Sequence, residues 1–240
     1  MNKETTQPIQ VDFELFKDDL NRVKDLIPTL ETKKVLRPKR QIPEQYTSMQ
    51  EYYTSVERLK RCYDKALKQR EKMKTRQAGE IDFRRFSLLT PNKNKKGSVV
   101  SYKDVYHAQE LQPIIDKLNE HYPQTENGMI WEPRGFFVYP PGGFMEWHTN
   151  EHQAGTRVYF THALEGGKSG INFVLEHQDF ETQIAESPDK QGWQHRSFFV
   201  GDGKQESANW HCIWSDTTRL SIGFGLIDRP WQRIPGALIS

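Results

Sequence analysis

Residues 156–176 read TRVYFTHALEGGKSGINFVLE, two short apolar or alternating runs joined by a glycine-rich turn. Similar runs recur through residues 129–228, among them GFFVY, RSFFVG, NWHCIWS and TTRLSIGFGLI. Short runs rich in aromatic and β-branched residues, separated by frequent turns, are typical of antiparallel strands. This stretch therefore predicts a mainly β fold, built as a sandwich, a barrel or a jelly roll.

The part of the chain before residue 129 has a helical pattern. Apolar residues recur at spacings of three and four from Phe13 to Leu30 and again from Met49 to Leu67, which predicts two helices that each bury one face. Pro28 falls in the last turn of the first helix, where it disfavours helical structure. Residues 108–122, AQELQPIIDKLNEHY, are a third helix candidate despite an internal proline.

Charge also divides the chain near residue 128. Residues 1–128 carry a formal net charge of +6, whereas residues 129–240 carry −4. We predict a helical N-terminal region over 1–128, which packs on or extends from the barrel, and a core over 129–240 that ends in a short tail. Residues 57–76 hold nine basic and three acidic side chains. They can contact an acidic partner or nucleic acid, although a solvated helix face explains the same charges.

Cysteine content and hydropathy indicate the compartment. Cys62 and Cys212 give the 240 residues no disulfide framework, which favours a reducing environment. No apolar run approaches about 18 residues, and the first residues, MNKETTQPIQ, lack the apolar stretch of a signal peptide. We therefore expect a soluble, cytoplasmic protein that does not interact with a membrane.

Histidine and arginine residues of the β region carry the candidate chemistry. His148 follows the run GFFVY and the turn PPGG, and His211 lies in NWHCIWS. A jelly roll brings distant strands together at its mouth, where two imidazoles can hold Fe(II) and leave positions open for further ligands. Arg219, two residues before Ser221, is suited to a bidentate grip on a carboxylate, and we expect it in a solvent-reachable pocket. Cys212 should point to the opposite face of its strand from His211.

The order of these motifs resembles the Fe(II)- and 2-oxoglutarate-dependent dioxygenases, nearest to the prolyl-4-hydroxylase-like branch. That family shows a tyrosine before a His-x-Asp motif, then a strand, a Gly-Gly turn and an apolar strand, and finally a distal histidine and an Arg-x-Ser strand. The residues that match are, in order, Tyr139, His148, residues 157–174, His211, Arg219 and Ser221. The resemblance covers about residues 129–228 and implies a double-stranded β-helix, the cupin-like form of the jelly roll.

The resemblance implies roles for individual residues. His148 and His211 would ligate iron, with Asn150 as an uncertain third ligand. Arg219 would pair with the distal carboxylate of 2-oxoglutarate, and the hydroxyls near it would come from Ser221, Tyr139 and, as a secondary candidate, Tyr159. The secondary candidates for substrate contact are Arg157 and Trp147. The implied reaction uses O2 to oxidise a C–H bond, by default hydroxylating it, and releases succinate and CO2. The substrate can be a protein side chain, an amino acid or a nucleic acid.

Asn150 stands where the family has aspartate, and the interval from His211 to Arg219 is slightly shorter than usual. An asparagine offers only a neutral carbonyl oxygen to a metal. It can ligate through that oxygen, or turn aside and leave a position open, as in relatives that bind water or halide there, or mark an inactive site. The otherwise complete co-substrate set leads us to expect a working site that holds iron weakly.

Two other classes of function fit parts of the sequence. A cupin-like binding module, or a catalytically silent relative that binds through its basic helices, would show no succinate release. Residues 148–152, HTNEH, fit the His-x-x-Glu-His pattern of inverted zinc peptidases, which requires a helix. The PPGG turn before this segment and Gly155 after it argue against a helix there.

Overall fold

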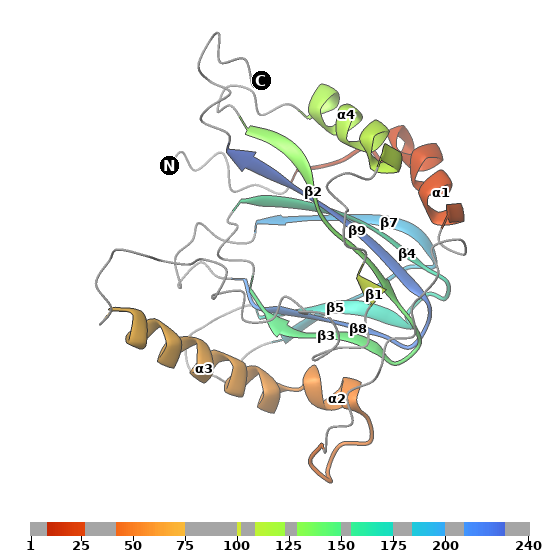
Figure 1. Cartoon of the computed structure of the whole chain (residues 1–240). Helices are drawn as coiled ribbons and strands as arrows, with labels where there is room; N and C mark the ends of the chain where they lie inside the picture. The colour runs from red at the N-terminus through yellow and green to blue at the C-terminus, as the bar shows by residue number, and fades with distance from the viewer. Residues whose placement is uncertain are drawn as a thin grey trace.

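Two antiparallel sheets face each other, and helices cover the outer side of each one (Figure 1). The computed structural model describes residues 9–26, 42–74, 100–101, 109–122, 129–149, 155–174, 184–199 and 209–228. The strands are β1 (Val100–Ser101), β2 (Met129–Tyr139), β3 (Gly143–His148), β4 (Thr156–Ala163), β5 (Ser169–Val174), β6 (Ile184–Pro188), β7 (Gly192–Phe199), β8 (His211–Ser215) and β9 (Arg219–Asp228). The helices are the 3-10 helices η2 (Phe13–Leu15) and η5 (Gln109–Leu111), and α1 (Lys17–Leu26), α2 (Met49–Tyr53), α3 (Val56–Lys74) and α4 (Gln112–His121).

From β2 onward, consecutive strands alternate between the two sheets, except that β5 and β6 are neighbours in one sheet. One sheet has the order β1-β2-β9-β4-β7 and the other the order β3-β8-β5-β6. The chain therefore crosses from β2 to β3, back to β4 and across to β5, pairs β5 with β6, and then alternates again through β7, β8 and β9. This winding is that of a double-stranded β-helix, and the fold class predicted from the sequence is confirmed. The division of the chain at residue 128 stays a prediction.

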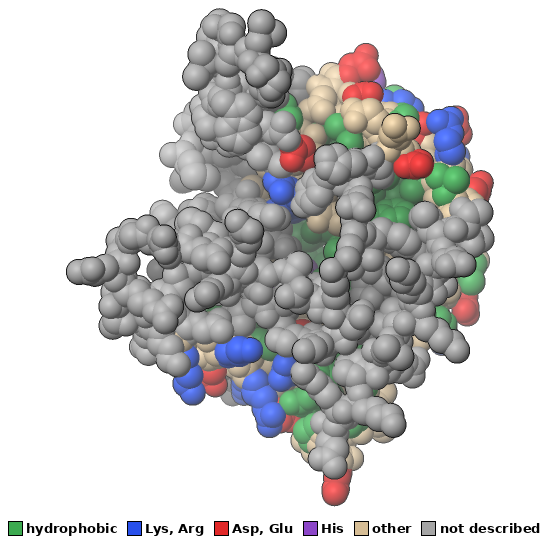
Figure 2. Space-filling view, viewed as in Figure 1, with side chains coloured by type: hydrophobic (Ala, Val, Ile, Leu, Met, Phe, Trp, Pro, Cys, Tyr) green, Lys and Arg blue, Asp and Glu red, His purple; other side chains and the backbone are tan. Residues whose placement is uncertain are grey.

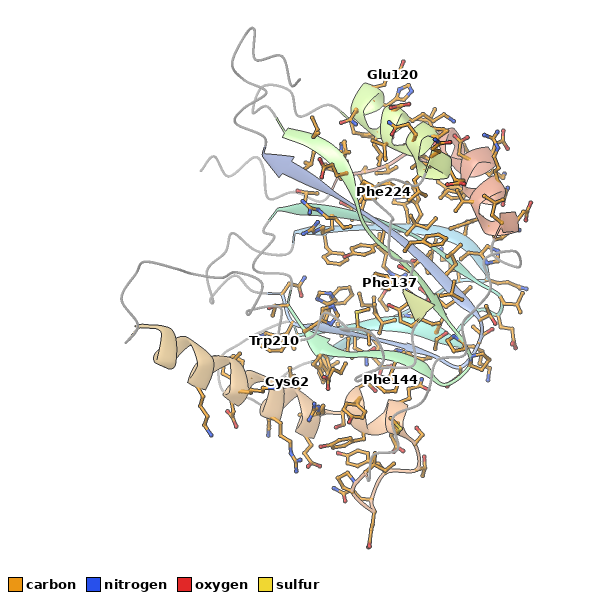
Figure 3. All side chains as sticks on the ribbon, in the orientation of Figure 1. Cys62, Glu120, Phe137, Phe144, Trp210 and Phe224 are labelled. Atoms are coloured by element: carbon orange, nitrogen blue, oxygen red, sulfur yellow. The ribbon has the colours of Figure 1, made fainter. Side chains whose placement is uncertain are left out.

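The first sheet has an apolar outer face that packs against helices. On β9, Ile222 and Phe224 join a core cluster with Leu20 of α1 and with Ile114 and Leu118 of α4, and all five side chains are fully buried. Because successive side chains of a strand point to opposite faces, Arg219 and Ser221 of β9 face the interior between the sheets. Figure 3 shows Phe224 on the helix side of this sheet and Phe137 between the two sheets.

Helix α3 covers the outer face of the second sheet. Leu59, Cys62 and Ala66 pack with Trp147 and Cys212 in a separate cluster, and Figure 3 shows Cys62 and Trp210 between α3 and this sheet. Cys212 therefore points away from the interior that its neighbour His211 faces, as expected. The Lys and Arg side chains at the lower edge of Figure 2 lie over the solvent side of α3, with acidic side chains among them.

The helices follow the sequence pattern with two differences. The helix expected from Met49 to Leu67 is divided between α2 and α3, because the hydroxyl of Ser55 accepts a 3.1 Å hydrogen bond from the Arg58 N–H and so begins a new helix. The first expected helix starts as η2 and continues as α1, and residues 27–30 lie outside the described part of the chain.

Pro113 lies in the first turn of α4, where a missing N–H costs no helical hydrogen bond. The helix expected there is therefore present despite its proline. None of the helices in the described ranges is long and apolar enough to cross a membrane.

Candidate active site

His148 and His211 meet at one end of the interior. His148 ends β3, His211 begins β8, and the two are register partners with ring centroids 4.2 Å apart. Both side chains are buried. A register shift between Met145 and His148 lets Glu146 and Trp147 both point outward, toward the helices, before His148 turns inward. The predicted convergence of the two histidines is therefore present in the fold.

Backbone carbonyls fix the orientation and the tautomer of both rings. Nδ1 of His148 lies 2.8 Å from the Glu146 carbonyl oxygen, and Nδ1 of His211 lies 2.9 Å from the Asn209 carbonyl oxygen. A carbonyl oxygen only accepts, so each Nδ1 carries the proton and the lone pair of the neutral ring is on Nε2. Histidine ligands of metals are commonly oriented in this way.

The electrostatic surroundings keep His211 neutral. Burial, aided by the neighbouring His148 and by Arg157, lowers the pKa of His211 to about 3. The ring is therefore uncharged at neutral pH, which is the form that binds a divalent metal.

The described residues contain no group of three His, Cys, Asp or Glu side chains placed to hold a metal ion. Asn150, the uncertain third ligand, lies outside the described residues, as do Glu151 and His152 of the HTNEH pattern. His148 ends a strand and is not on a helix. This placement does not fit the zinc-peptidase pattern, in which two histidines share one helix face.

Arg219 marks the other end of the interior. It begins β9, just after the turn that follows β8. Because β8 runs from His211 to Ser215 at about 3.3 Å per residue, the Arg219 end of the interior lies roughly 13 Å from His211 along the strand direction. Arg219 pairs in register with Tyr139, and its Cζ lies 5.1 Å from the centroid of the Tyr139 ring. Ser221, also buried, pairs with Thr161 of β4. The three predicted co-substrate residues Arg219, Ser221 and Tyr139 thus lie together.

A buried carboxylate that the sequence did not reveal holds Arg219 in place. Arg219 Nε donates a 2.7 Å hydrogen bond to Oδ2 of Asp189. Asp189 also accepts hydrogen bonds from Ser169 Oγ at 2.6 Å, Gln194 Nε2 at 2.6 Å and Arg196 Nη1 at 2.5 Å. Burial favours a higher pKa for Asp189, but Arg219, the Ser169 hydroxyl and Arg196 outweigh it and hold the pKa below its ordinary value. The carboxylate is therefore ionised.

The expectation that Arg219 lies in a solvent-reachable pocket is wrong in this respect: its side chain is only 3% exposed and the side chain of Asp189 is 0% exposed. Asp189 follows β6 and lies 30 residues before Arg219 in the sequence. No local motif therefore predicted the contact between them.

Three buried polar atoms near Arg219 have no hydrogen-bond partner within the described residues. They are Tyr139 Oη, Thr161 Oγ1 and Arg219 Nη1, from three neighbouring strands. Burial raises the pKa of Tyr139 far above its ordinary value, so its hydroxyl stays protonated. Buried polar atoms are rarely left without partners in native proteins, and three donors on one inner surface match the acceptor capacity of a carboxylate.

An aromatic layer lies between the two ends of the interior. Tyr159 stacks on Phe198, with ring centroids 5.3 Å apart, and Phe198 lies 5.7 Å from His211 in an edge-to-face arrangement. A Cβ at Gly223 would approach the Tyr159 ring to 2.7 Å, so the glycine makes room for the ring on the inner face. Tyr159 therefore lines the same interior as Arg219, as the resemblance implied.

Arg157 lies on the inner face toward the histidine end. Its guanidinium passes over Gly225, where any Cβ would collide with Nη1, and its positive charge helps to lower the pKa of His211. This position suits the substrate contact that the sequence suggested for it.

Trp147 has a different place from the one expected. It is fully buried, and its Nε1 donates a 2.9 Å hydrogen bond to the Ser55 carbonyl oxygen at the start of α3. Trp147 therefore packs the helix onto the outer face of the sheet and does not line the interior.

The comparisons with known proteins give structural neighbours only. No protein-family model matches the chain, and no curated protein matches it significantly. A Pseudomonas putida prolyl-4-hydroxylase is 15% identical, covers 56% of this chain and 73% of its own, and has a TM-score of 0.37. A 2OG-Fe(II) oxygenase family oxidoreductase from Burkholderia pseudomallei is 9% identical (56% and 67% covered, TM-score 0.38). The Schizosaccharomyces pombe Cnp3 cupin domain is 14% identical (43% and 61% covered, TM-score 0.26). Because the identities and TM-scores are low, we base the function on the residues of this chain.

Proposed function

We propose that the chain is a non-haem Fe(II)- and 2-oxoglutarate-dependent oxygenase that hydroxylates a C–H bond and releases succinate and CO2. The observation that carries this proposal is the placement of two sets of residues in one interior. Two oriented imidazoles, His148 and His211, lie at one end. At the other end lies the buried Arg219, whose Nη1 has no hydrogen-bond partner within the described residues. A 2-oxo acid with a second carboxylate would match both ends, with its 2-oxo acid group at the histidines and its second carboxylate at Arg219.

The residues fit a metal ion of the iron type. His148 and His211 would hold Fe(II) through Nε2, since their Nδ1 atoms are engaged by carbonyl oxygens. Two protein nitrogens leave several coordination positions for a chelating co-substrate and O2, which this chemistry requires. Asn150 would supply a neutral oxygen or leave one more position open. When bound, iron and 2-oxoglutarate together supply the activation of O2, coupled to decarboxylation of the 2-oxo acid.

The residues also fit 2-oxoglutarate. Arg219 would bind the distal carboxylate through its Nη atoms, because Nε is already hydrogen-bonded to Asp189. Tyr139 and Ser221 would add hydroxyl contacts, and both are buried beside Arg219. Charge-assisted hydrogen bonds of this kind are stronger than neutral ones. Tyr159 is closer to the histidine end and would contact the middle of the ligand.

Apolar side chains would exclude water from the space between the two ends. Met145, Ile171 and Ile213 cluster with Tyr139, and Phe137, Phe173 and Phe198 pack against them. A dry interior strengthens the electrostatic contacts to a bound carboxylate and limits side reactions of the bound intermediates with water.

We also propose that the exposed basic side chains of α3 contact an acidic partner or a nucleic-acid substrate. Lys60, Lys65 and Lys68 are exposed on the helix surface, while Arg61 already forms an ion pair with Glu57 at 2.7 Å. Binding through such charges would weaken steeply with rising salt. If the affinity for a partner is the same at about 50 mM and about 200 mM salt, this surface does not hold that partner.

The experiment that tests the function measures consumption of 2-oxoglutarate and formation of succinate with Fe(II) and O2, across a panel of candidate amino acids, peptides and oligonucleotides. An oxygenase forms succinate in step with substrate oxidation. A cupin-like binding module or a catalytically silent relative forms none, and a zinc peptidase needs neither iron nor 2-oxoglutarate.

A further inference from the structure

Asp189 and Arg219 form a buried ion pair with several further hydrogen bonds. The Asp189 carboxylate accepts four side-chain hydrogen bonds, two of them from arginines, and is completely buried. Arg219 uses only Nε for this contact. Because the guanidinium is planar, this hydrogen bond also fixes the direction of its Nη atoms, which remain available for a ligand. Its Nη1 is buried and has no partner among the residues the structure describes.

Thr161 lies beside this arginine on the neighbouring strand. It is the register partner of Ser221, two residues along β9 from Arg219, and is 1% exposed. Cross-strand diagonal neighbours of this kind lie close enough for their side chains to share a ligand. Its Oγ1 is a third buried polar atom without a partner in the described ranges, along with Tyr139 Oη and Arg219 Nη1.

The charges at this end call for one further anion. Arg196 and Arg219 contribute two positive charges, and Asp189 contributes one negative charge. A single carboxylate would bring the sum to zero. A buried charge is costly unless it is paired, so the surroundings favour a ligand with one carboxylate at this end.

We infer that, in the carboxylate site proposed above, Asp189 is the positioning residue of Arg219 and Thr161 is an additional binding hydroxyl. The inference rests on the proposed function and deepens it, since the carboxylate would be the distal one of 2-oxoglutarate. Asp189 lies outside the motifs that suggested the function, and Thr161 lies within residues 157–174 but has no role assigned by the resemblance.

The test of Thr161 compares two ligands that differ only at the distal end. Binding of 2-oxoglutarate and of 2-oxopentanoate, which lacks the distal carboxylate, is measured calorimetrically on the full chain with Fe(II) under anaerobic conditions. The dissociation constant of 2-oxopentanoate divided by that of 2-oxoglutarate measures the contribution of the distal carboxylate alone. Thr161→Val removes the hydroxyl at nearly constant volume and should lower this ratio about tenfold, the effect of one charge-assisted hydrogen bond. Thr161→Ser keeps the hydroxyl and should retain the ratio.

The test of Asp189 uses ligand length, because a fixed arginine selects length and a loose one does not. The wild type should prefer 2-oxoglutarate to 2-oxoadipate, one methylene longer, by roughly tenfold. In Asp189→Asn this preference should fall close to one. A role of Asp189 in stability alone would lower the melting temperature without changing the preference. A role through charge alone would tighten both ligands equally.

A second variant keeps the inference testable if Asp189→Asn does not fold. Ser169→Ala removes one hydrogen bond to Asp189 without leaving a charge unpaired, and should shift the length preference in the same direction by a smaller factor. The inference is overturned if Thr161→Val keeps the wild-type ratio of dissociation constants, or if the folded Asp189 or Ser169 variant keeps the wild-type preference for ligand length. In either case, binding of 2-oxoglutarate by the wild type would still support the proposed function. Failure of the wild type to bind 2-oxoglutarate overturns the proposed function and the inference with it.

Discussion

His148 and His211 are paired in register across β3 and β8, and their ring centroids lie 4.2 Å apart. The two residues come from strands that are far apart in the sequence and adjacent in the sheet. Each ring is oriented by a backbone carbonyl and buried beside apolar side chains. The fold thus holds the two proposed metal-binding rings close together.

Replacing Asn150 with aspartate should tighten Fe(II) binding. Asn150 lies outside the described residues, and the prediction rests on its position two residues after His148. Aspartate would add an anionic oxygen to two neutral nitrogens. Even changes outside the first coordination sphere alter metal affinity by about 10–100-fold, so the gain should reach at least about tenfold in an anaerobic competition titration. An unchanged affinity would show that residue 150 does not approach the metal.

Arg219 should contribute to both ligand binding and stability. Arg219→Ala leaves the buried Asp189 with one arginine fewer, and breaking a buried pair costs about 3–5 kcal/mol. It should also weaken 2-oxoglutarate binding at least about tenfold. Arg219→Lys keeps the charge but cannot serve Asp189 and a ligand at once. It should therefore lose affinity with a smaller loss in urea stability. Wild-type affinity in both variants would place the carboxylate anchor elsewhere, with Arg157 as the next candidate.

The metal-free protein should lose stability in mild acid because of His211. The pKa of His211 is about 3 in the folded chain and about 6.5 when unfolded. Between these values the unfolded chain binds a proton that the folded chain does not. The free energy of unfolding contributed by this residue is therefore complete above about pH 6.5 and falls toward pH 3, by about 1.4 kcal/mol per pH unit.

Urea unfolding at several pH values between about 4 and 6.5 checks this slope. His211→Asn cannot take up the proton, so the free energy of unfolding of this variant should depend less steeply on pH. Equal slopes for the wild type and His211→Asn would contradict the prediction.

The contact between Arg58 and Glu146 should stabilise the docking of α3. Arg58 Nη2 lies 2.6 Å from Glu146 Oε2, and the Glu146 side chain is 1% exposed. Arg58→Ala leaves this carboxylate buried without the arginine and should cost about 3 kcal/mol in chemical denaturation. The double variant Arg58→Met, Glu146→Leu removes both charges and should recover most of the loss. If the double variant is no more stable than Arg58→Ala, the ion pair is not the cause.

Much of the fold could be predicted because strand and helix periodicities are local properties. The runs around Phe136, Phe160 and Phe224 alternate as strands with one face against helices do. The two histidines converge as a jelly roll was expected to bring them, and Arg219 lies on the last strand. Thr161 could have been found, since it is two residues from Tyr159 and shares its strand face.

Other features depend on contacts between distant segments. Asp189 contacts Arg219 only because β6, β7 and β9 pack together in the fold. No residue adjacent to Asp189 in the sequence predicts that contact. Glu146 points outward together with Trp147 because the register shift in β3 places two consecutive side chains on one face. Strict alternation would have placed Glu146 and not Trp147 on the inner side, together with His148.

The central claim is that His148 and His211 bind iron in an interior that also binds 2-oxoglutarate. The most direct test is anaerobic titration of the full chain with Fe(II) and then 2-oxoglutarate, followed by visible absorption, in the wild type, His148→Ala and His211→Ala. His195→Ala is the control, because His195 pairs with the outward-facing Phe160 of β4. The account predicts binding in the wild type and the control, and none in the other two variants. Wild-type metal binding in both His148→Ala and His211→Ala, or no binding of 2-oxoglutarate by the wild type at millimolar concentration, would contradict it.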